Sequence, residues 1–481
     1  MSYLDKSIYE ISKLLKERKV KSVDLVKECA ENIKNNAHLN ALISTRVEEA
    51  LKEAEYCDNL LDKGLELPLL TGIPIVIKDN INMIGTKTTC ASKFLENYES
   101  VYDATVVEKL KANNAIIIGK ANMDEFAMGS STENSAFGPC LNPIDNTRVP
   151  GGSSGGSACA VKANLAFASL GTDTGGSIRQ PAGFCGVVGI KPTYGLVSRY
   201  GVVAYASSLD QVGPITKNVK DACIMLDVLE GYDEREFTSE KREKGDYLKN
   251  LKPNVKSLKI GVSSKFMAMG MDKCVENAIN NAIEIFKANG AEIVNIELEN
   301  IDKTLPVYYT LASAEASSNL GRFDGVRFGR RSETAKDLND LYYKSRTEGF
   351  GKEVKHRIML GNFVLSSGYY DAYYKKAVKV QQIIRDEFNS AFKECDVIVC
   401  PIAPTTAFKL GENVSDPVKM YLGDIYSIPV NIAGLPALTL PCGEDENGMP
   451  IALQIIGNKF SEQTILNTAE FFENIFKGGK F

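Results

Sequence analysis

Two loops rich in glycine and serine carry the residues of this chain that are best suited to catalysis. They run from Gly151 to Ala158 and from Leu170 to Pro181. Glycine lets the backbone approach a ligand and turn its N–H groups inward, and a serine hydroxyl can act as a nucleophile or a proton relay. Flexible linkers share this composition, but they do not normally lie between apolar runs such as 163–170 and 187–190. The loops therefore predict an active site.

Three known uses of such loops fit this sequence poorly. A phosphate-binding loop would end in Gly-Lys-Ser/Thr and a dinucleotide site would show GxGxxG after a strand, and neither pattern occurs. Residues 151–155 and 152–156 match the GxSxG nucleophile elbow, yet its base would have to be His356, which lies between Lys355 and Arg357. The segment 173–175 reads Asp-Thr-Gly, which is half of an aspartic-protease pair, and no second copy is found.

The fourth use is a serine nucleophile that is activated by a lysine through a second serine. The lysine must be neutral to accept a proton, so its pKa has to fall from about 10.4 toward about 7 or 8, and burial can cause that shift. Lys78 ends the apolar run 72–77, which predicts a side chain that leaves a strand toward a polar loop. Spacing alone does not choose Lys78 over Lys120 or Lys191.

Composition excludes several other classes of protein. The chain has 481 residues, of which 44% are hydrophobic and 24% charged, and these values are typical of a folded globular protein. Its net charge of -5 argues against a surface that binds nucleic acid directly. With only two histidines and no CxxC pair, a metal site is not expected. The eleven cysteines indicate buried thiols and a cytoplasmic location, and the N-terminus does not resemble a secretion signal.

The pattern of elements predicts an α/β fold. Residues 1–65 read as helices, and Ser22 is expected to cap the second of them. Beyond residue 68, short apolar runs alternate with longer helical stretches, which indicates a large mixed, mostly covered β-sheet flanked by helices. These runs are 73–77, 115–118, 187–190, 260–262, 397–400 and 451–456.

Two further segments need a separate interpretation. The charged segment 231–257 is expected to be a solvated excursion on the surface of a single domain that spans 1–481. The uncharged stretch 425–443 contains three prolines, so it is expected to form buried strands and turns and not a membrane span.

Three strings of the sequence together resemble the amidase signature family. They are Gly-Ile-Pro-Ile-Val-Ile-Lys-Asp at 72–79, the Gly/Ser string at 151–157 and the string at 171–182. The resemblance implies the amidase signature fold, with Ser177 as the acylated nucleophile, Lys78 as the base and Ser153 as the relay after a cis peptide bond. The oxyanion hole would be formed by backbone N–H groups of Thr174, Gly175, Gly176 and Ser177.

Other strings are similar to one branch of that family, the glutaminase components of the tRNA-dependent amidotransferases. These strings lie at 123–134, 315–320, 353–376 and 423–426. The branch implies an enzyme that hydrolyses glutamine and supplies ammonia for converting Glu-tRNA(Gln), Asp-tRNA(Asn) or both into their amidated forms. By the same resemblance, Arg357 would bind the α-carboxylate of glutamine and Asp424 its α-ammonium, with Gly129, Ser130 and Tyr308 close by.

The resemblance also implies partners. It predicts a heterotrimer with a larger B subunit, which binds tRNA and uses ATP and Mg²⁺, and a small C subunit. This chain itself would hold no cofactor and no metal, would contact no membrane and would reach tRNA mainly through the larger partner. Two alternatives stay open at this stage. A stand-alone amidase acting on another amide would not need Arg357 or Asp424, and a silent scaffold would not need Ser177.

Overall fold

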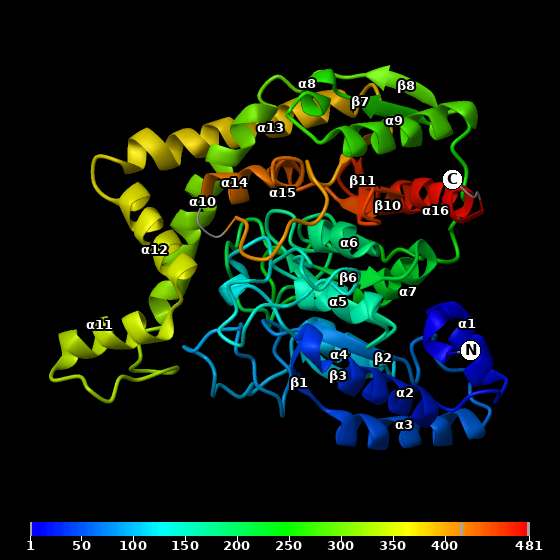
Figure 1. The fold of residues 1–481 in the computed structure, drawn as a ribbon, viewed down its shortest axis with the longest axis horizontal. Helices are drawn as coiled ribbons and strands as arrows, with labels where there is room; N and C mark the ends of the chain where they lie inside the picture. The colour runs from blue at the N-terminus through cyan, green and yellow to red at the C-terminus, as the bar shows by residue number, and fades with distance from the viewer. Residues whose placement is uncertain (1, 414–416, 479–481) are drawn as a thin grey trace.

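An eleven-stranded mixed sheet runs through the centre of the computed structural model, which describes residues 2–413 and 417–478 (Figure 1). In these residues the strand order is β1-β3-β2-β4-β6-β5-β10-β11-β9-β7-β8. The strands are β1 Leu42–Thr45, β2 Pro74–Lys78, β3 Ile116–Ala121, β4 Ala168–Asp173, β5 Val188–Lys191, β6 Gln211–Thr216, β7 Lys259–Val262, β8 Glu292–Asn295, β9 Val397–Pro401, β10 Ala437–Glu444 and β11 Pro450–Gly457.

Helices cover the sheet and extend to one side of it. They are α1 Ile8–Lys16, α2 Ser22–Asn35, α3 Val47–Asp62, α4 Thr105–Ala112, α5 Gly155–Lys162, α6 Arg179–Cys185, α7 Val219–Leu229, α8 Ser264–Met267, α9 Lys273–Ala288, α10 Thr304–Asn319, α11 Leu338–Gly349, α12 Lys352–Leu365, α13 Lys375–Ala391, α14 Pro417–Leu422, α15 Ile428–Ala433 and α16 Glu462–Gly478. Every residue of β2, β4 and β6 is buried, so both faces of the sheet are covered there. The predicted fold class is confirmed.

Parallel pairing brings the ends of two central strands together. β2 pairs in parallel with β3 on one side and with β4 on the other, and Ile77 lies opposite Leu170. Because parallel neighbours end at the same edge of a sheet, the last residue of β2, Lys78, lies beside the C-terminal part of β4. The loops that follow such carboxyl ends are where open α/β sheets bind their ligands.

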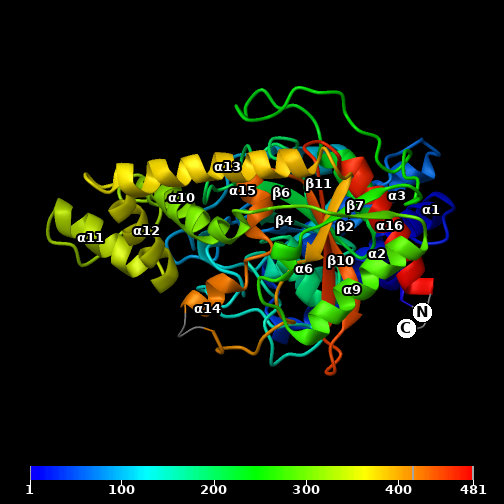
Figure 2. The ribbon, with the colours of Figure 1, turned by 90° about the horizontal axis from the view of Figure 1, so that it is seen from above.

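The helices from α10 to α13 form an arm that projects from the sheet (Figures 1 and 2). α10 packs along α12 and α13, and a π-helical turn at Tyr370–Tyr374 connects α12 to α13. α10 also packs against α15, which lies close to the sheet. The arm is therefore attached to the rest of the fold through the contacts of α10 and α13 with α15.

The expected cap of the second helix is wrong. Ser22 is the first residue of α2 and its hydroxyl donates to the carbonyl oxygen of Gly72. The carboxylate of Asp58, on α3, instead accepts hydrogen bonds from the backbone N–H groups of Ser22 and Val23 at 2.7 and 3.2 Å. A carboxylate at a helix N-terminus also interacts favourably with the helix dipole.

The uncharged stretch 425–443 forms strand β10, but its first part is helical, contrary to the prediction. Pro429 lies in the first turn of α15, where its missing N–H is no loss, and Gly434 ends the helix with φ +74. Most residues of the charged segment 231–257 are exposed. Within the described ranges no helix is long and apolar enough to cross a membrane.

Candidate active site

Lys78 and the first serine loop form a compact hydrogen-bonded cluster at the end of β2. The Nζ atom of Lys78 lies 2.7 Å from Ser153 Oγ, 2.9 Å from Ser154 Oγ and 2.9 Å from Thr172 Oγ1. Thr172 belongs to β4, and both serines immediately precede α5. The parallel strands supply the lysine and the threonine, and the glycines of the serine loop allow it to pack closely on its other neighbours, since a Cβ atom added to Gly152 would clash with Asp124 and one added to Gly155 with Thr132.

The amine of Lys78 is fully buried. Burial lowers the pKa of Lys78 to about 7, because the charged form loses its hydration. Three buried carboxylates oppose this effect only in part, and they are Asp124, Asp173 and Asp210. At neutral pH a large fraction of the lysine is therefore the free amine, which is the form that accepts a proton.

The two other candidate lysines have different surroundings. Lys120 lies 3.3 Å from the Asp79 carboxylate and donates to the carbonyl oxygens of Ile81 and Lys87. Lys191 donates to the carbonyl oxygen of Pro192 at 2.8 Å. In the part of the chain that the structure describes, neither amine forms a hydrogen bond with a serine, so geometry selects Lys78.

The second serine loop carries Ser177 next to this cluster. The backbone N–H of Ser154 donates to the carbonyl oxygen of Ser177 at 3.1 Å, and the peptide bond between Gly152 and Ser153 is cis, as the resemblance implies. Ser177 is buried, with 8% of its surface exposed. Within residues 2–413 and 417–478 no hydrogen bond joins Ser177 Oγ to Ser153 or Lys78. The structure thus shows the first contact of the expected relay and places the nucleophile candidate beside it.

A buried ion pair anchors the second loop. The Arg179 guanidinium donates to both carboxylate oxygens of Asp173, at 3.0 and 3.1 Å, and both side chains are fully buried. Burial alone would raise the pKa of Asp173, but Arg179 holds it well below its usual range. Asp173 also accepts the N–H groups of Gly176 and Ile178 at 2.8 and 3.2 Å. The carboxylate therefore shapes the turn that presents Ser177.

This contact changes the expectation for the oxyanion hole. The N–H of Gly176 donates to Asp173, so it is not available to a reacting carbonyl in this structure. The N–H groups of Thr174, Gly175 and Ser177 have no acceptor among the described residues. These three amides, and not the amide of Gly176, are the free donors of the loop.

The residues expected to bind substrate meet at the junction of the arm and the sheet. The hydroxyl of Ser130 donates to Asp424 Oδ2 at 2.6 Å, and Tyr309 donates to the same oxygen at 3.4 Å. The guanidinium of Arg357, on α12, lies 4.8 Å from the ring centre of Tyr309. Tyr309 thus lies between the cation and the anion, and the sequence analysis did not identify it.

Two further residues hold the cation in place. Arg357 donates through Nε to Glu353 at 2.7 Å and through Nη1 to the hydroxyl of Tyr205 at 2.6 Å. Sequence analysis missed both, although the spacing of Glu353 and Arg357 is the helical i, i+4 spacing of ion pairs. Burial raises the pKa of Asp424 to about 7, and the Ser130 hydrogen bond and the Arg357 charge oppose that effect.

Tyr308 and Gly129 border the same region. A Cβ atom added to Gly175 would lie 2.7 Å from Tyr308 Cζ, so the tyrosine ring is packed directly on the loop of Ser177. A Cβ atom added to Gly129 would clash with Asp124, the carboxylate that accepts the backbone N–H of Thr132. A cavity of about 330 Å³ begins next to Ser130 and is also lined by Gln180, Phe184 and Gly423. The described residues contain no group of three or more His, Cys, Asp or Glu that is placed to hold a metal.

Comparison with known proteins places the chain in a family. The sequence profile described as Amidase matches residues 24–466. The A subunit of glutamyl-tRNA(Gln) amidotransferase from Caldanaerobacter subterraneus is 54% identical over 472 residues, which are 98% of this chain and 96% of that protein. The protein of the same description from Clostridium botulinum is 52% identical over 99% of this chain and 98% of its own length.

Solved structures agree with these sequence matches. The crystal structure of the A subunit of glutamyl-tRNA(Gln) amidotransferase from Thermotoga maritima has a TM-score of 0.82 and 43% identity, covering 98% of this chain and 95% of that one. The peptide amidase of Stenotrophomonas maltophilia has a TM-score of 0.84 and 28% identity, covering 99% and 98%. The profile, the full-length relatives and the shared fold show that this chain belongs to the Amidase family.

Proposed function

We propose that this chain is the glutamine-hydrolysing component of a tRNA-dependent amidotransferase. The full-length relatives that are 52–54% identical are described as the A subunit of glutamyl-tRNA(Gln) amidotransferase, which supports this assignment. The observation that carries it is the contact of 2.7 Å between Lys78 Nζ and Ser153 Oγ beside Ser177. An opposite-charge pair, Arg357 and Asp424, lies at the same junction and suits the two charged ends of an amino acid.

Acylation begins with the free amine of Lys78. In the proposed reaction this amine takes a proton from Ser153 while Ser153 takes the proton of Ser177 Oγ. Ser177 Oγ then forms a bond to the side-chain amide carbon of glutamine, and the carbonyl oxygen becomes an oxyanion. The free N–H groups of Thr174, Gly175 and Ser177 are proposed to donate to that oxyanion. Removal of one such donor typically costs a factor of about 100 to 1,000 in rate.

Collapse of the tetrahedral intermediate releases ammonia. The proton held by Lys78 returns through Ser153 to the leaving nitrogen, and the carbon–nitrogen bond breaks. Ser177 is left as a γ-glutamyl ester. A water molecule then attacks the ester with the same lysine acting as base, and glutamate leaves. Both half-reactions use the same proton path, so one pKa controls the two steps.

Substrate recognition follows from the charges at the junction. Arg357 is held by Glu353 and Tyr205 with one side of its guanidinium toward Tyr309, and it is proposed to bind the α-carboxylate. Asp424 is proposed to bind the α-ammonium together with Ser130. Gly129 and Tyr308 would border the bound glutamine.

The partners and cofactors of the reaction are also part of the proposal. The names of the relatives, which call each of them one subunit, imply that those proteins work in a complex. We infer a heterotrimer in which a B subunit binds tRNA, ATP and Mg²⁺ and a small C subunit completes the assembly. A net charge of -5 supports a division of labour in which the partner holds the tRNA. The cytoplasmic location stays a prediction.

The test is glutamate release by the purified chain, alone and in the complex with its partners. Wild type is expected to hydrolyse glutamine, and Ser177→Ala and Lys78→Ala are expected to lose that activity. Arg357→Met and Asp424→Asn are expected to raise the KM for glutamine. A stand-alone amidase would keep its activity in the last two variants, and wild-type release by Ser177→Ala would contradict the proposed nucleophile.

A further inference from the structure

Asp210 lies where strand β6 meets the loop of Ser177. In the antiparallel pair of β4 and β6, Gln211 is opposite Asp173, so the preceding residue, Asp210, lies beyond the end of β4. Asp210 is buried, with 7% of its surface exposed. The hydroxyl of Thr174 donates to Asp210 Oδ1 at 2.6 Å. One carboxylate oxygen thus holds the loop that carries the free amides.

The other carboxylate oxygen of Asp210 holds a different part of the site. Asp210 Oδ2 accepts the backbone N–H groups of Tyr205 and Ala206 at 2.9 and 3.1 Å. The hydroxyl of Tyr205 in turn accepts a hydrogen bond from Arg357 Nη1 at 2.6 Å. A single carboxylate therefore connects the loop of Ser177 with the support of the Arg357 cation.

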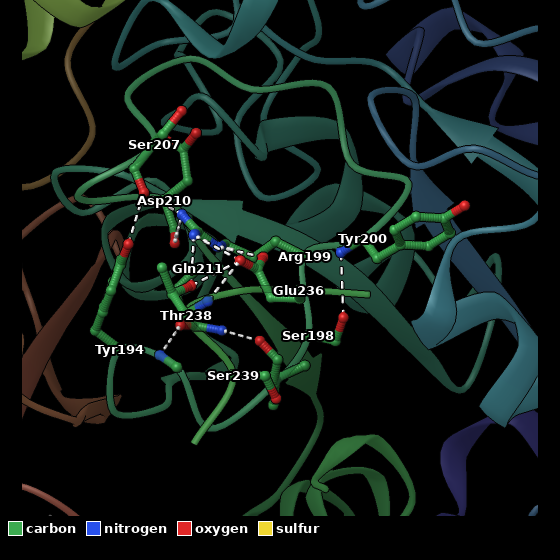
Figure 3. Close-up of polar contacts among 12 residues, drawn as sticks. Tyr194, Ser198, Arg199, Tyr200, Ser207, Asp210, Gln211, Glu236, Thr238 and Ser239 are labelled. Atoms are coloured by element: carbon green, nitrogen blue, oxygen red, sulfur yellow. Dashed lines mark hydrogen bonds and ion pairs between the residues drawn. The ribbon is translucent and has the colours of Figure 1, made fainter. Parts of the chain in front are cut away.

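The loop that carries Asp210 is fixed from its outer side by Arg199 (Figure 3). Arg199 Nη1 donates to the carbonyl oxygens of Ser207 and Asp210, while its Nε donates to Glu236 at 3.1 Å. Its Nη2 donates to Thr238 at 2.7 Å. Glu236 and Thr238 belong to the charged segment 231–257, so this segment contributes an ion pair that immobilises the loop. Hydrogen bonds to the carboxylate of Asp210 and to its backbone carbonyl oxygen therefore fix the position of this residue.

We propose that Asp210 is a positioning residue that couples the oxyanion loop to the subsite for the substrate α-carboxylate. This inference rests on the proposed function. Asp210 acts through Thr174 on the reacting carbonyl and through Tyr205 on Arg357. The contacts with Thr174 and those with Tyr205 predict different kinetic effects. The oxyanion forms only in the transition state, whereas the α-carboxylate is bound throughout the reaction.

The test uses the chain in its assembled complex, with rates normalised to the fraction of Ser177 that can be acylated. Loss of one buried hydrogen bond corresponds to a factor of about ten. Thr174→Val is expected to lower kcat about tenfold at unchanged KM, and Tyr205→Phe to raise the KM for glutamine about tenfold at unchanged kcat. Asp210→Ala is expected to do both. With 4-aminobutanamide, which lacks the α-carboxylate, the Tyr205→Phe effect on KM should disappear.

Two comparisons separate this role from a merely structural one. Asp210→Asn keeps an acceptor for the two backbone N–H groups and a polar partner for Thr174, so it is expected to recover most of both parameters. Asp221 is also a buried carboxylate, and it accepts the N–H groups of Ile8 and Tyr9 far from the site. Asp221→Ala is expected to lower the melting temperature and to leave kcat and KM per active site unchanged.

The inference is overturned if Asp210→Ala, per active site, keeps the wild-type kcat and KM. If Asp210→Ala does not fold, the double variant of Thr174→Val and Tyr205→Phe decides. Because one substitution acts on kcat and the other on KM, this double variant is expected to lose about a hundredfold in kcat/KM, and a wild-type kcat or KM in it contradicts the proposed role of Asp210. A wild-type complex that releases no glutamate would contradict the proposed function itself. If the wild-type complex is active, the kinetics of the variants test the role of Asp210 alone.

Discussion

The amine of Lys78 lies 2.7 Å from the hydroxyl oxygen of Ser153, in a site where its near partners are all uncharged oxygens. Lys120, buried to the same extent, lies 3.3 Å from the Asp79 carboxylate. In the described chain no carboxylate forms an ion pair with Lys78. A buried ammonium without a counterion is costly, so the structure favours the neutral amine that serine activation requires.

The first prediction concerns the pH dependence of kcat. Because burial lowers the pKa of Lys78 to about 7, the neutral fraction rises with pH and is nearly complete one to two units above that value. We expect kcat for glutamine hydrolysis to increase about tenfold per pH unit below the midpoint and to level off above it. Lys78→Arg, which stays charged, is expected to be inactive throughout the range.

Lys191 provides the matched control for this profile. Burial also lowers its pKa to about 7, but its amine donates to the carbonyl oxygen of Pro192. Lys191→Met is therefore expected to keep the midpoint of the wild-type profile. A midpoint that moves with Lys191, or a measurable rate in Lys78→Arg, would contradict the role of Lys78.

The second prediction concerns KM. Burial raises the pKa of Asp424 to about 7, so in the free protein the carboxyl group is mostly protonated below that pH and mostly ionised above it. Since an ammonium group binds the ionised form, the KM for glutamine is expected to fall as pH rises through about 7. Asp424→Asn should give a higher KM that does not vary over this range, as measured by initial rates between pH 6 and 8. An unchanged pH dependence in that variant would exclude the proposed contact.

The third prediction concerns the stability of the second loop. Asp173→Asn leaves the Arg179 charge buried without its partner, and breaking a buried pair in this way costs about 3–5 kcal/mol. The pKa of Asp173 is held well below its usual range, so its carboxyl group is ionised at pH 7. The contribution of the ion pair to the free energy of unfolding is therefore fully present at pH 7 and is lost only on acidification. Urea unfolding at pH 7 measures the loss.

An exposed ion pair is the control for that measurement. Lys249 and Asp246 lie 3.7 Å apart with side chains that are 81% and 53% exposed. Asp246→Asn is expected to change the free energy of unfolding by less than about 1 kcal/mol. Equal effects of the two substitutions would show that Asp173 does not anchor the loop.

The fourth prediction concerns Gly175. A Cβ atom at this position would lie 2.7 Å from Tyr308 Cζ, so Gly175→Ala must displace either the tyrosine ring or the loop. We expect kcat to fall at least about tenfold, because the free N–H groups move away from the oxyanion. Gly321→Ala is the control, since beyond its immediate neighbours in the chain nothing lies within 4 Å of its added Cβ. Steady-state kinetics of the two variants check the difference.

Local sequence patterns predicted much of the sheet and part of the site. The apolar runs beginning at 73, 187 and 451 correspond to β2, β5 and β11. Strand β4 was not predicted as a strand, because Ala168–Asp173 consists largely of small residues and lacks the bulky β-branched pattern. The prediction that Ser22 caps α2 was wrong for another reason. Asp58 reaches that helix from α3, and no local pattern contains such a contact.

The substrate end of the site shows the same limit. Arg357 and Asp424 were identified by resemblance, and without it each would be taken for a surface charge. Tyr309 contacts both of these residues and Tyr205 contacts Arg357, and all of these contacts join segments that are far apart in sequence. Among the lysines, sequence left Lys78, Lys120 and Lys191 equivalent. Only the distances to the serines, which depend on the parallel pairing of β2 with β4, distinguish them in physical terms.

The most direct test of the account is the covalent intermediate on Ser177. The complex is mixed with glutamine, quenched in acid within the first turnovers and digested, and the peptide containing residue 177 is examined by mass spectrometry. The account predicts a γ-glutamyl ester on Ser177 in the wild type and none in Ser177→Ala or Lys78→Ala. An ester on another residue, or glutamate release at the wild-type rate by Ser177→Ala, would contradict it.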